Sequence, residues 1–117
     1  MRPTYEITAV QQAGTVIGSG GTVTATGISW SDTYEPDVKL VVNVGASAAG
    51  ALVADLQQSS VLASGYTSIG SITAGSVTGV SYLDVFATAQ YLRVVSTATG
   101  GTTAMTANLL GKKRTVL

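Results

Sequence analysis

The chain has 117 residues, the length of one ordinary domain and enough to bury a hydrophobic core. Hydrophobic residues make up 45% of it, so its apolar content argues against disorder. Charged residues make up only 10%, against roughly 25% in typical soluble domains, and the net charge is zero. A surface with so few charges has little electrostatic protection against self-association, and we expect it to be buried against neighbouring subunits.

The chain contains no histidine and no cysteine. These absences exclude disulfides, thiolate metal sites and nucleophilic catalysis with a histidine base. The segment from Met1 to Glu6 has no basic region followed by an apolar run, which predicts no signal peptide. No stretch approaches ~20 uninterrupted apolar residues, the length that a membrane-spanning helix needs. We therefore expect a protein that is not an enzyme, uses no cofactor and does not contact a membrane.

Threonine, valine, serine and glycine dominate the chain, a composition typical of strands joined by short turns. In chain order, the predicted strands are residues 5–10, 22–30, 38–45, 51–59, 67–72, 79–85, 90–97 and 103–110. Dense alanine leaves one helix open as an alternative at residues 46–56, although Gly50 disfavours it.

Several of these strands alternate between apolar and polar residues, which indicates sheets with one buried face. The apolar positions supply the predicted core: Val42, Val44, Leu56, Leu92, Val94 and Leu109. Strands that recur at about 8–12 residues with turns between them favour a sandwich or barrel. We predict an all-β fold, an antiparallel two-sheet β-sandwich that is jelly-roll-like or Ig-like, with residues 1–117 as a single domain.

One cluster of carboxylates, Asp32, Glu35 and Asp37, follows the strand that ends at Trp30. Two carboxylates held roughly 5–9.5 Å apart can catalyse glycoside hydrolysis, and several together can bind Ca²⁺. Our main interpretation is a solvated loop broken by Pro36, with no metal site. Ca²⁺ binding and catalysis remain the alternatives.

The residues that we nominate for contact with a partner are Trp30, Tyr34, Lys112, Lys113 and Arg114. The aromatic residues either form a binding platform together with other tyrosines of the chain or fill the core. The three basic residues hold half of the basic charge, and they either contact an acidic neighbour or packaged nucleic acid or form a solvated tail. The rest of the chain is mildly acidic, which predicts no specific nucleic-acid binding.

The last third of the sequence resembles small structural proteins of tailed bacteriophages. The resemblance rests on three features: Leu83-Asp84-Val85 before a strand with the pattern Tyr-x-Arg-Val, a Gly-Gly-Thr-Thr turn, and an alternating final strand with a basic end. Such proteins are β-sandwiches, often jelly-roll-like, that decorate or cement the head or build the neck and tail. The resemblance implies a virion protein, made in the host cytoplasm, that self-associates as a trimer and docks on the major capsid protein or another virion protein.

The sequence thus predicts a non-enzymatic virion structural protein, in particular a capsid decoration or cement protein. The alternative is a carbohydrate- or receptor-binding β-sandwich module on a phage tip or cell surface. A sugar-binding module needs at least one exposed aromatic ring beside polar donors, whereas a decoration protein buries apolar surface against its neighbours.

Overall fold

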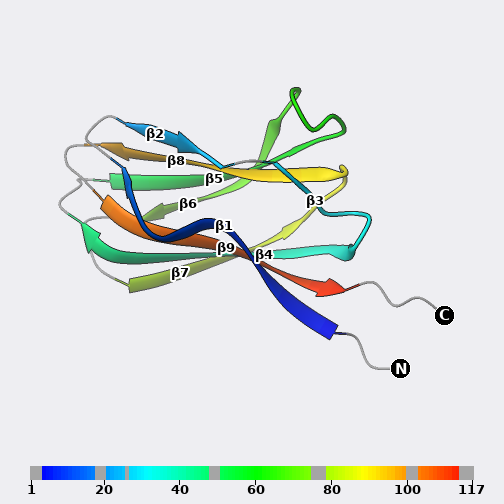
Figure 1. Ribbon diagram of the computed structural model, residues 1–117, viewed down its shortest axis with the longest axis horizontal. Coiled ribbons are helices and arrows are strands. Elements are labelled where there is room, and N and C mark those ends of the chain that lie inside the picture. The colour runs from blue at the N-terminus through cyan, green and yellow to red at the C-terminus, as the bar shows by residue number, and fades with distance from the viewer. Residues whose placement is uncertain are drawn as a thin grey trace.

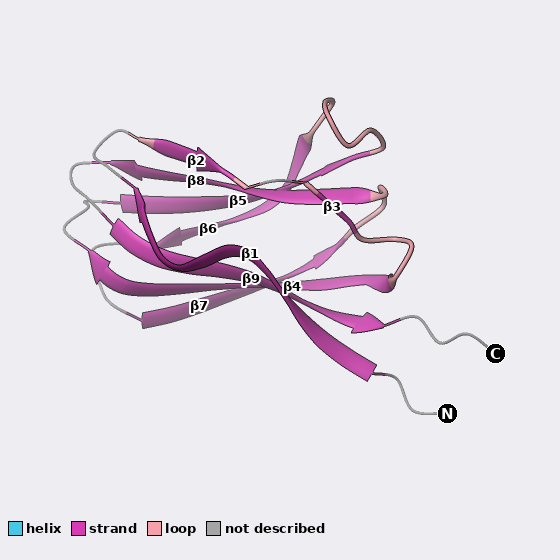
Figure 2. Cartoon of the chain, in the orientation of Figure 1, coloured by secondary structure: helices cyan, strands magenta, loops and turns pink. Residues whose placement is uncertain are grey.

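The computed structural model describes the backbone of residues 4–17, 21–25, 27–47, 51–74, 79–99 and 103–113, and the side chains of 21–25, 27–45, 52–74, 79–99 and 104–112. Throughout these ranges the chain forms strands, turns and bends, and no helix (Figure 2). The strands are β1 (Thr4–Ile17), β2 (Thr22–Thr24), β3 (Ile28–Ser29), β4 (Tyr34–Ser47), β5 (Ala51–Ser59), β6 (Thr67–Ala74), β7 (Gly79–Phe86), β8 (Tyr91–Thr99) and β9 (Thr103–Lys113).

The strands form two antiparallel sheets that lie face to face (Figure 1). One sheet has the order β1-β9-β4-β7, and the other has the order β2-β8-β5-β6 with β3 also paired to β8. The pairing is nested, because β1 pairs with β9, β2 and β3 with β8, β4 with β7, and β5 with β6. The described chain therefore resembles one long rolled-up hairpin. Its strands alternate between the two sheets, except that β2 and β3 share the second sheet, as do β5 and β6 at the closed end.

This arrangement is the jelly roll, one of the two topologies that the sequence left open. In an Ig-like sandwich the first two strands lie in the same sheet. Here β1 and β2 lie in opposite sheets, so the Ig-like alternative is wrong and the predicted antiparallel β-sandwich is confirmed.

A single hydrophobic core fills the space between the two sheets. The six residues predicted for it are confirmed as buried, each with at most 2% of its surface exposed. They meet through the sheet register, in which Leu56 of β5 lies opposite Val94 of β8 and Val44 of β4 lies opposite Met105 of β9. Burying one such side chain stabilises the fold by about 1.5–3 kcal/mol, so the core accounts for the alternation seen in the sequence.

The carboxylate segment departs from the prediction, because β4 begins at Tyr34 and already contains Glu35 and Asp37. The register of β4 against β9 shifts between Tyr34 and Val38, and Pro36 lies in that irregular part. A proline is tolerated there because its missing N–H is not required by a regular ladder. Its carbonyl still accepts a hydrogen bond from the Ala87 N–H at 2.9 Å. The interpretation of the whole cluster as a loop is therefore wrong.

Other elements also differ from the prediction. The first strand, predicted at residues 5–10, is longer, because β1 runs from Thr4 to Ile17. The predicted strand 22–30 is two short strands, β2 and β3. The helix alternative is wrong where the chain is described, because Ser47 ends β4 and β5 runs from Ala51. The last strand continues past residue 110 because it pairs with the start of β1, where Tyr5 lies opposite Lys112 and Thr4 opposite Lys113.

Candidate interaction surface

Two of the residues nominated for partner contact, Trp30 and Tyr34, are core residues in the structure. Trp30 is 1% exposed and Tyr34 is 9% exposed, and their rings stack with centroids 4.3 Å apart. The Trp30 indole N–H donates to the Glu35 carbonyl at 2.9 Å, which fixes the ring. Both residues border a small hollow, but so little of their surface is exposed that the structure favours the core-filling interpretation for both.

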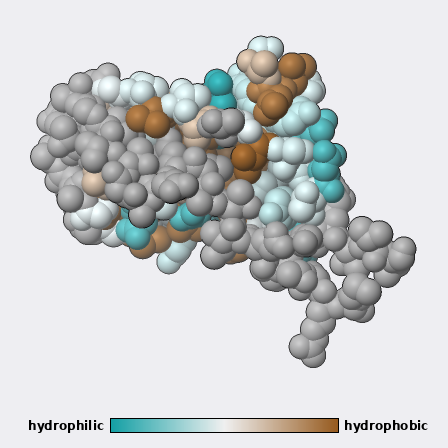
Figure 3. All heavy atoms as spheres, viewed as in Figure 1, coloured by the Kyte–Doolittle hydropathy of each residue, from teal (hydrophilic) through white to brown (hydrophobic). Residues whose placement is uncertain are grey.

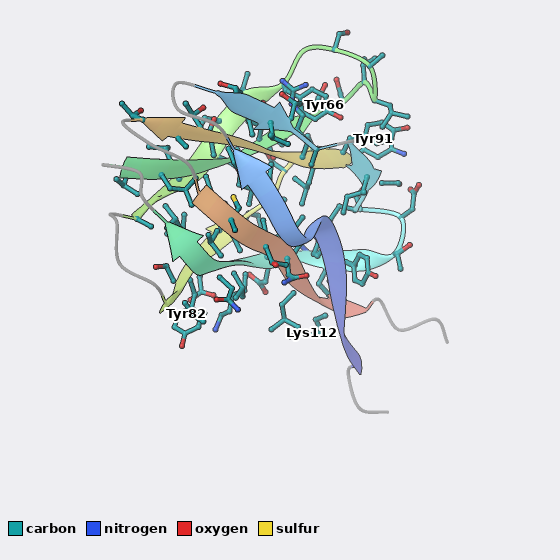
Figure 4. The ribbon with its side chains drawn as sticks, turned by 60° about the vertical axis from the view of Figure 1, so that its left-hand side comes forward. Tyr66, Tyr82, Tyr91 and Lys112 are labelled. Atoms are coloured by element: carbon teal, nitrogen blue, oxygen red, sulfur yellow. The ribbon has the colours of Figure 1, made fainter. Side chains whose placement is uncertain are left out.

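The structure describes the three basic residues near the end of the chain to different extents. Lys112 lies in β9 with its side chain half-buried on the outer face of the first sheet (Figure 4). Lys113 ends β9, and only its backbone is described, while Arg114 lies outside the described residues. Lys112 at least belongs to a sheet surface and not to a free tail.

The three carboxylates do not come together. Asp32 accepts hydrogen bonds from the Ser29 hydroxyl at 2.8 Å and the Gln90 side-chain amide at 3.2 Å, beside a hollow of about 250 Å³. Asp37 lies on the outer face of the first sheet, in a different groove. Within the described ranges, no group of three or more acidic side chains is placed to hold a metal ion.

The tyrosines considered as a platform with Trp30 are also spread over the molecule. Tyr91 lies in the second sheet and Tyr66 lies against that sheet in the connection before β6, whereas Tyr82 projects from the first sheet on the other side (Figure 4). The Arg93 guanidinium covers the Tyr66 ring at 4.0 Å from its centroid. The described aromatic side chains therefore do not make one continuous platform.

The largest exposed apolar side chains of a strand lie on β7. Its outward-facing residues, Val80, Tyr82, Asp84 and Phe86, are called the β7 face below. Val80 is 51% exposed, Tyr82 67% and Phe86 62%. Lys39 of β4 accompanies them, with its ammonium 3.8 Å from the Asp84 carboxylate and 5.7 Å from the centroid of the Tyr82 ring. Figure 3 shows hydrophobic residues along the lower edge of the molecule, where Figure 1 places β7.

A groove of about 500 Å³ lies beside the β7 face on the same sheet. It combines apolar side chains with two lysines and two aspartates, so it offers both charge signs and no excess of either. The residues that line it are Asp37, Val38, Lys39, Asp84, Val85, Phe86, Leu110 and Lys112. Lys112, predicted from the sequence to contact a partner, therefore lines the same groove as two residues of the β7 face, Asp84 and Phe86.

Sequence reasoning missed Val80 and Phe86 as surface residues. The signal that could have found them is the pattern of β7 itself, in which apolar residues occupy both faces. A strand with one solvated face carries polar residues there. Chemically, this surface can bind apolar and weakly polar partners, and it carries neither of the side chains, histidine or cysteine, that most often supply a base or nucleophile.

The described part of the chain therefore defines a jelly-roll sandwich with an apolar surface on one edge strand. No protein-family model matches this chain, and no curated protein matches its sequence. In the parts of the chain that the structure describes, we find no helix long and apolar enough to cross a membrane.

Solved structures with a similar fold include the PBSX exported protein XepA, with a TM-score of 0.69 at 9% identity over 97% of this chain and 38% of XepA. VP2 of the infectious bursal disease virus subviral particle has a TM-score of 0.61 at 10% identity, over 95% of this chain and 32% of VP2. A carbohydrate-binding module of Cellvibrio mixtus lichenase 5A, solved with cellotriose, has a TM-score of 0.51 at 14% identity, over 97% of this chain and 88% of the module. At such identities the likeness shows the fold alone, and the chain spans well under half of XepA and of VP2.

Proposed function

We propose that this protein is a non-enzymatic structural protein of a virion, and specifically a decoration or cement protein that self-associates and docks on the major capsid shell. The observation that carries the proposal is the β7 face, where Val80, Tyr82 and Phe86 are each more than half exposed. Exposed apolar side chains gathered on one strand in this way mark interaction sites in soluble proteins. Burial of these side chains against a neighbour removes that surface from water.

The sparse charge of the chain supports the same proposal. The twelve charged side chains, six basic and six acidic, are spread over 6080 Å² of accessible surface, about 500 Å² for each. A standard contact of ~800 Å² per partner therefore buries fewer than two of them on average. Since each buried charge carries a desolvation cost, a surface of this composition suits packing between many like subunits. In a particle, weak contacts are also multiplied by avidity.

The fold and the resemblance add further support. Jelly rolls occur in viral capsid proteins and in lectins, and VP2, which shares this fold, is named as part of a subviral particle. The final third of the chain resembles phage structural proteins, and the implied location is the virion. The trimer that the resemblance implies stays a prediction.

Carbohydrate binding is the second candidate, and one observation favours it. On the outer face of the second sheet, Arg93 donates to the Gln57 amide oxygen at 2.8 Å, and Gln57 donates to the Asp55 carboxylate at 2.8 Å. Tyr66 lies over Arg93. A ring beside amide, guanidinium and carboxylate groups is the arrangement that a sugar-binding surface uses. These polar groups already satisfy one another, so we rank this candidate second.

Self-association is tested by sedimentation of the purified chain at tens of micromolar. We expect an oligomer that persists from low salt to about 0.5 M, where the Debye length of around 4 Å weakens exposed ion pairs and leaves apolar contacts nearly intact. The Val80→Lys variant is expected to shift the equilibrium towards monomer by at least about tenfold, because it places a charge in the apolar contact. Leu62→Lys is the matched control, since Leu62 is 50% exposed in the β5–β6 connection. A wild-type chain that is monomeric in both salts, with binding to a soluble oligosaccharide such as cellotriose, would favour the second candidate.

Docking is tested by co-sedimentation with shells assembled from the major capsid protein encoded in the same genome. Replacing Lys112 by glutamine is expected to weaken binding to the shell several-fold while leaving the oligomer intact, because the groove loses one of its two positive charges. Asn108→Gln, a neutral change on the same strand, is the control. Equal binding by wild type and Lys112→Gln would remove Lys112 from the docking contact, and no binding by wild type would contradict the cement role.

A further inference from the structure

The edge strands of the two sheets differ in how well they are protected against pairing with another chain. An edge strand exposes unpaired backbone N–H and C=O groups, and proteins protect such edges by short strands, bulges, prolines or charges. β2 has only three residues. β1 has register shifts against β9 between Ala9 and Gln11 and between Gln11 and Thr15. These two edges are therefore short or irregular.

β6 and β7 are the edge strands on the other side of the sandwich. β6 contains a register shift in its pairing with β5, where Ile69 is skipped between Ser68 and Gly70, and it exposes the hydroxyl side chains of Thr67, Ser68, Ser71 and Thr73. β7, in contrast, pairs with β4 without any register shift from Gly79 to Phe86. It contains no lysine and no proline, and its one charged residue, Asp84, lies beside Lys39 of the same chain. β7 is the described edge that combines length, regularity and exposed apolar side chains.

We propose that β7 pairs antiparallel with β7 of a second copy about a two-fold axis at Leu83, so that the first sheets of two subunits become one continuous sheet. This inference rests on the self-association in the proposed function and names the contact that produces it. Edge-to-edge pairing satisfies the free backbone groups of both copies and buries the apolar side chains of the β7 face. It also predicts that the isolated chain is a dimer and not the trimer that the resemblance to phage structural proteins implies.

The position of the axis follows from which side chains must share a face. A two-fold axis perpendicular to the sheet keeps outward-facing residues opposite outward-facing residues. One residue must therefore lie directly opposite its own copy, with the axis midway between the two. With the axis at Leu83, Val80 lies opposite Phe86 of the partner subunit. Tyr82 then lies opposite Asp84 of the partner subunit, which brings that carboxylate towards the Lys39 ammonium at the Tyr82 ring.

The neighbouring registers are less favourable. An axis at Asp84 places the Asp84 carboxylates of both copies directly opposite each other, and like charges in that position are destabilising. An axis at Tyr82 places Asp84 opposite apolar Val80 of the partner subunit and moves Phe86 beyond the end of the partner's strand at Gly79. Leu83 is therefore the centre that pairs Val80 with Phe86 and separates the like charges.

The test uses disulfide trapping with single cysteines at the exposed positions Val80, Tyr82, Asp84 and Phe86. Because the natural chain has no cysteine, each variant carries one thiol, and all four positions tolerate substitution without loss of core packing. Oxidised Val80→Cys alone should stay monomeric on denaturing gels, because two copies of residue 80 lie six positions apart, about 20 Å. A mixture of Val80→Cys and Phe86→Cys should cross-link at least about tenfold faster than either alone, since opposite residues approach disulfide distance. The mixture of Tyr82→Cys with Asp84→Cys should behave in the same way.

The outcomes separate this inference from the proposed function. Rapid self-cross-linking of Tyr82→Cys or of Asp84→Cys would overturn the axis at Leu83 and place it at that residue. An oligomer by sedimentation without any cross-link in the mixtures would overturn β7 pairing and leave self-association standing. A wild-type chain that is monomeric at the same concentration would overturn both.

Discussion

Replacing Val94 by aspartate is expected to prevent folding at room temperature. Val94 is completely buried in β8, lies opposite Leu56 of β5, and its carbonyl accepts a hydrogen bond from the Ala25 N–H at 2.9 Å. An aspartate at this position would place a carboxylate without a partner among apolar side chains. Such burial costs several kcal/mol, which is comparable to the whole stability of about 5–15 kcal/mol that domains of this size have.

The measurement is circular dichroism with a thermal melt, which should show strand signal and a cooperative transition for wild type and neither for Val94→Asp. Thr99→Asp is the matched control, because it introduces the same side chain at an exposed position of the same strand. We expect its stability to stay within about 0.5 kcal/mol of wild type. A folded Val94→Asp protein with an unchanged melting temperature would show that β8 has a different register.

The second large effect concerns the contact between Trp30 and Gly111. The Cβ that an alanine would add at Gly111 meets the Cζ2 and Cη2 atoms of the Trp30 ring well inside van der Waals contact. The ring cannot retreat, because it stacks on Tyr34 and its N–H is bonded to the Glu35 carbonyl. Gly111→Ala is therefore expected to lower the free energy of unfolding by about 1–3 kcal/mol through overpacking. Trp30→Ala should lower it by about 3–5 kcal/mol through the cavity that it leaves.

Two comparisons make this prediction specific. Gly45→Ala is the control, because Gly45 lies in β4 of the same sheet and the nearest atom to its added Cβ is the Ala104 carbonyl oxygen at 3.9 Å. We expect it to be neutral or slightly stabilising. In a double-mutant cycle, Trp30→Phe removes the clashing ring atoms, so Gly111→Ala should cost clearly less in that background. Equal costs in both backgrounds, measured by denaturant unfolding, would show that the ring does not limit the site.

The alternation of the strands was sufficient to predict six residues of the core. Val42, Val44, Leu56, Leu92, Val94 and Leu109 were predicted from a period of two and are buried in the structure. This pattern is readable because each of these strands has one face towards the core and one towards solvent. The same logic fails for β7, where Leu83 and Val85 face inward and Tyr82 and Phe86 face outward, so the apolar pattern does not separate the two sides.

The candidate residues were less predictable, because their roles depend on neighbours that are distant in sequence. Trp30 is buried because Gly111, 81 positions later, leaves room for its ring. Lys112 belongs to a sheet because β9 meets the first strand of the chain at Tyr5. The residues around Trp30 and Lys112 in the sequence carry no information about these distant neighbours. From the sequence alone, the aromatic residue fits a surface platform as well as a core, and the basic residue fits a tail as well as a sheet.

The sequence by itself determined the all-β class, the approximate positions of most strands, the buried face of most strands and the sparse charge, because these follow from composition and local periodicity. Only the tertiary structure decided which strands pair, that the sandwich is a jelly roll and that β7 lies at an edge. Strand order is set by contacts between segments far apart in the chain, such as β1 with β9, and no local pattern specifies them. The proposed interaction surface depends on that order, since the same β7 residues in the middle of a sheet would have no free edge to offer a second copy.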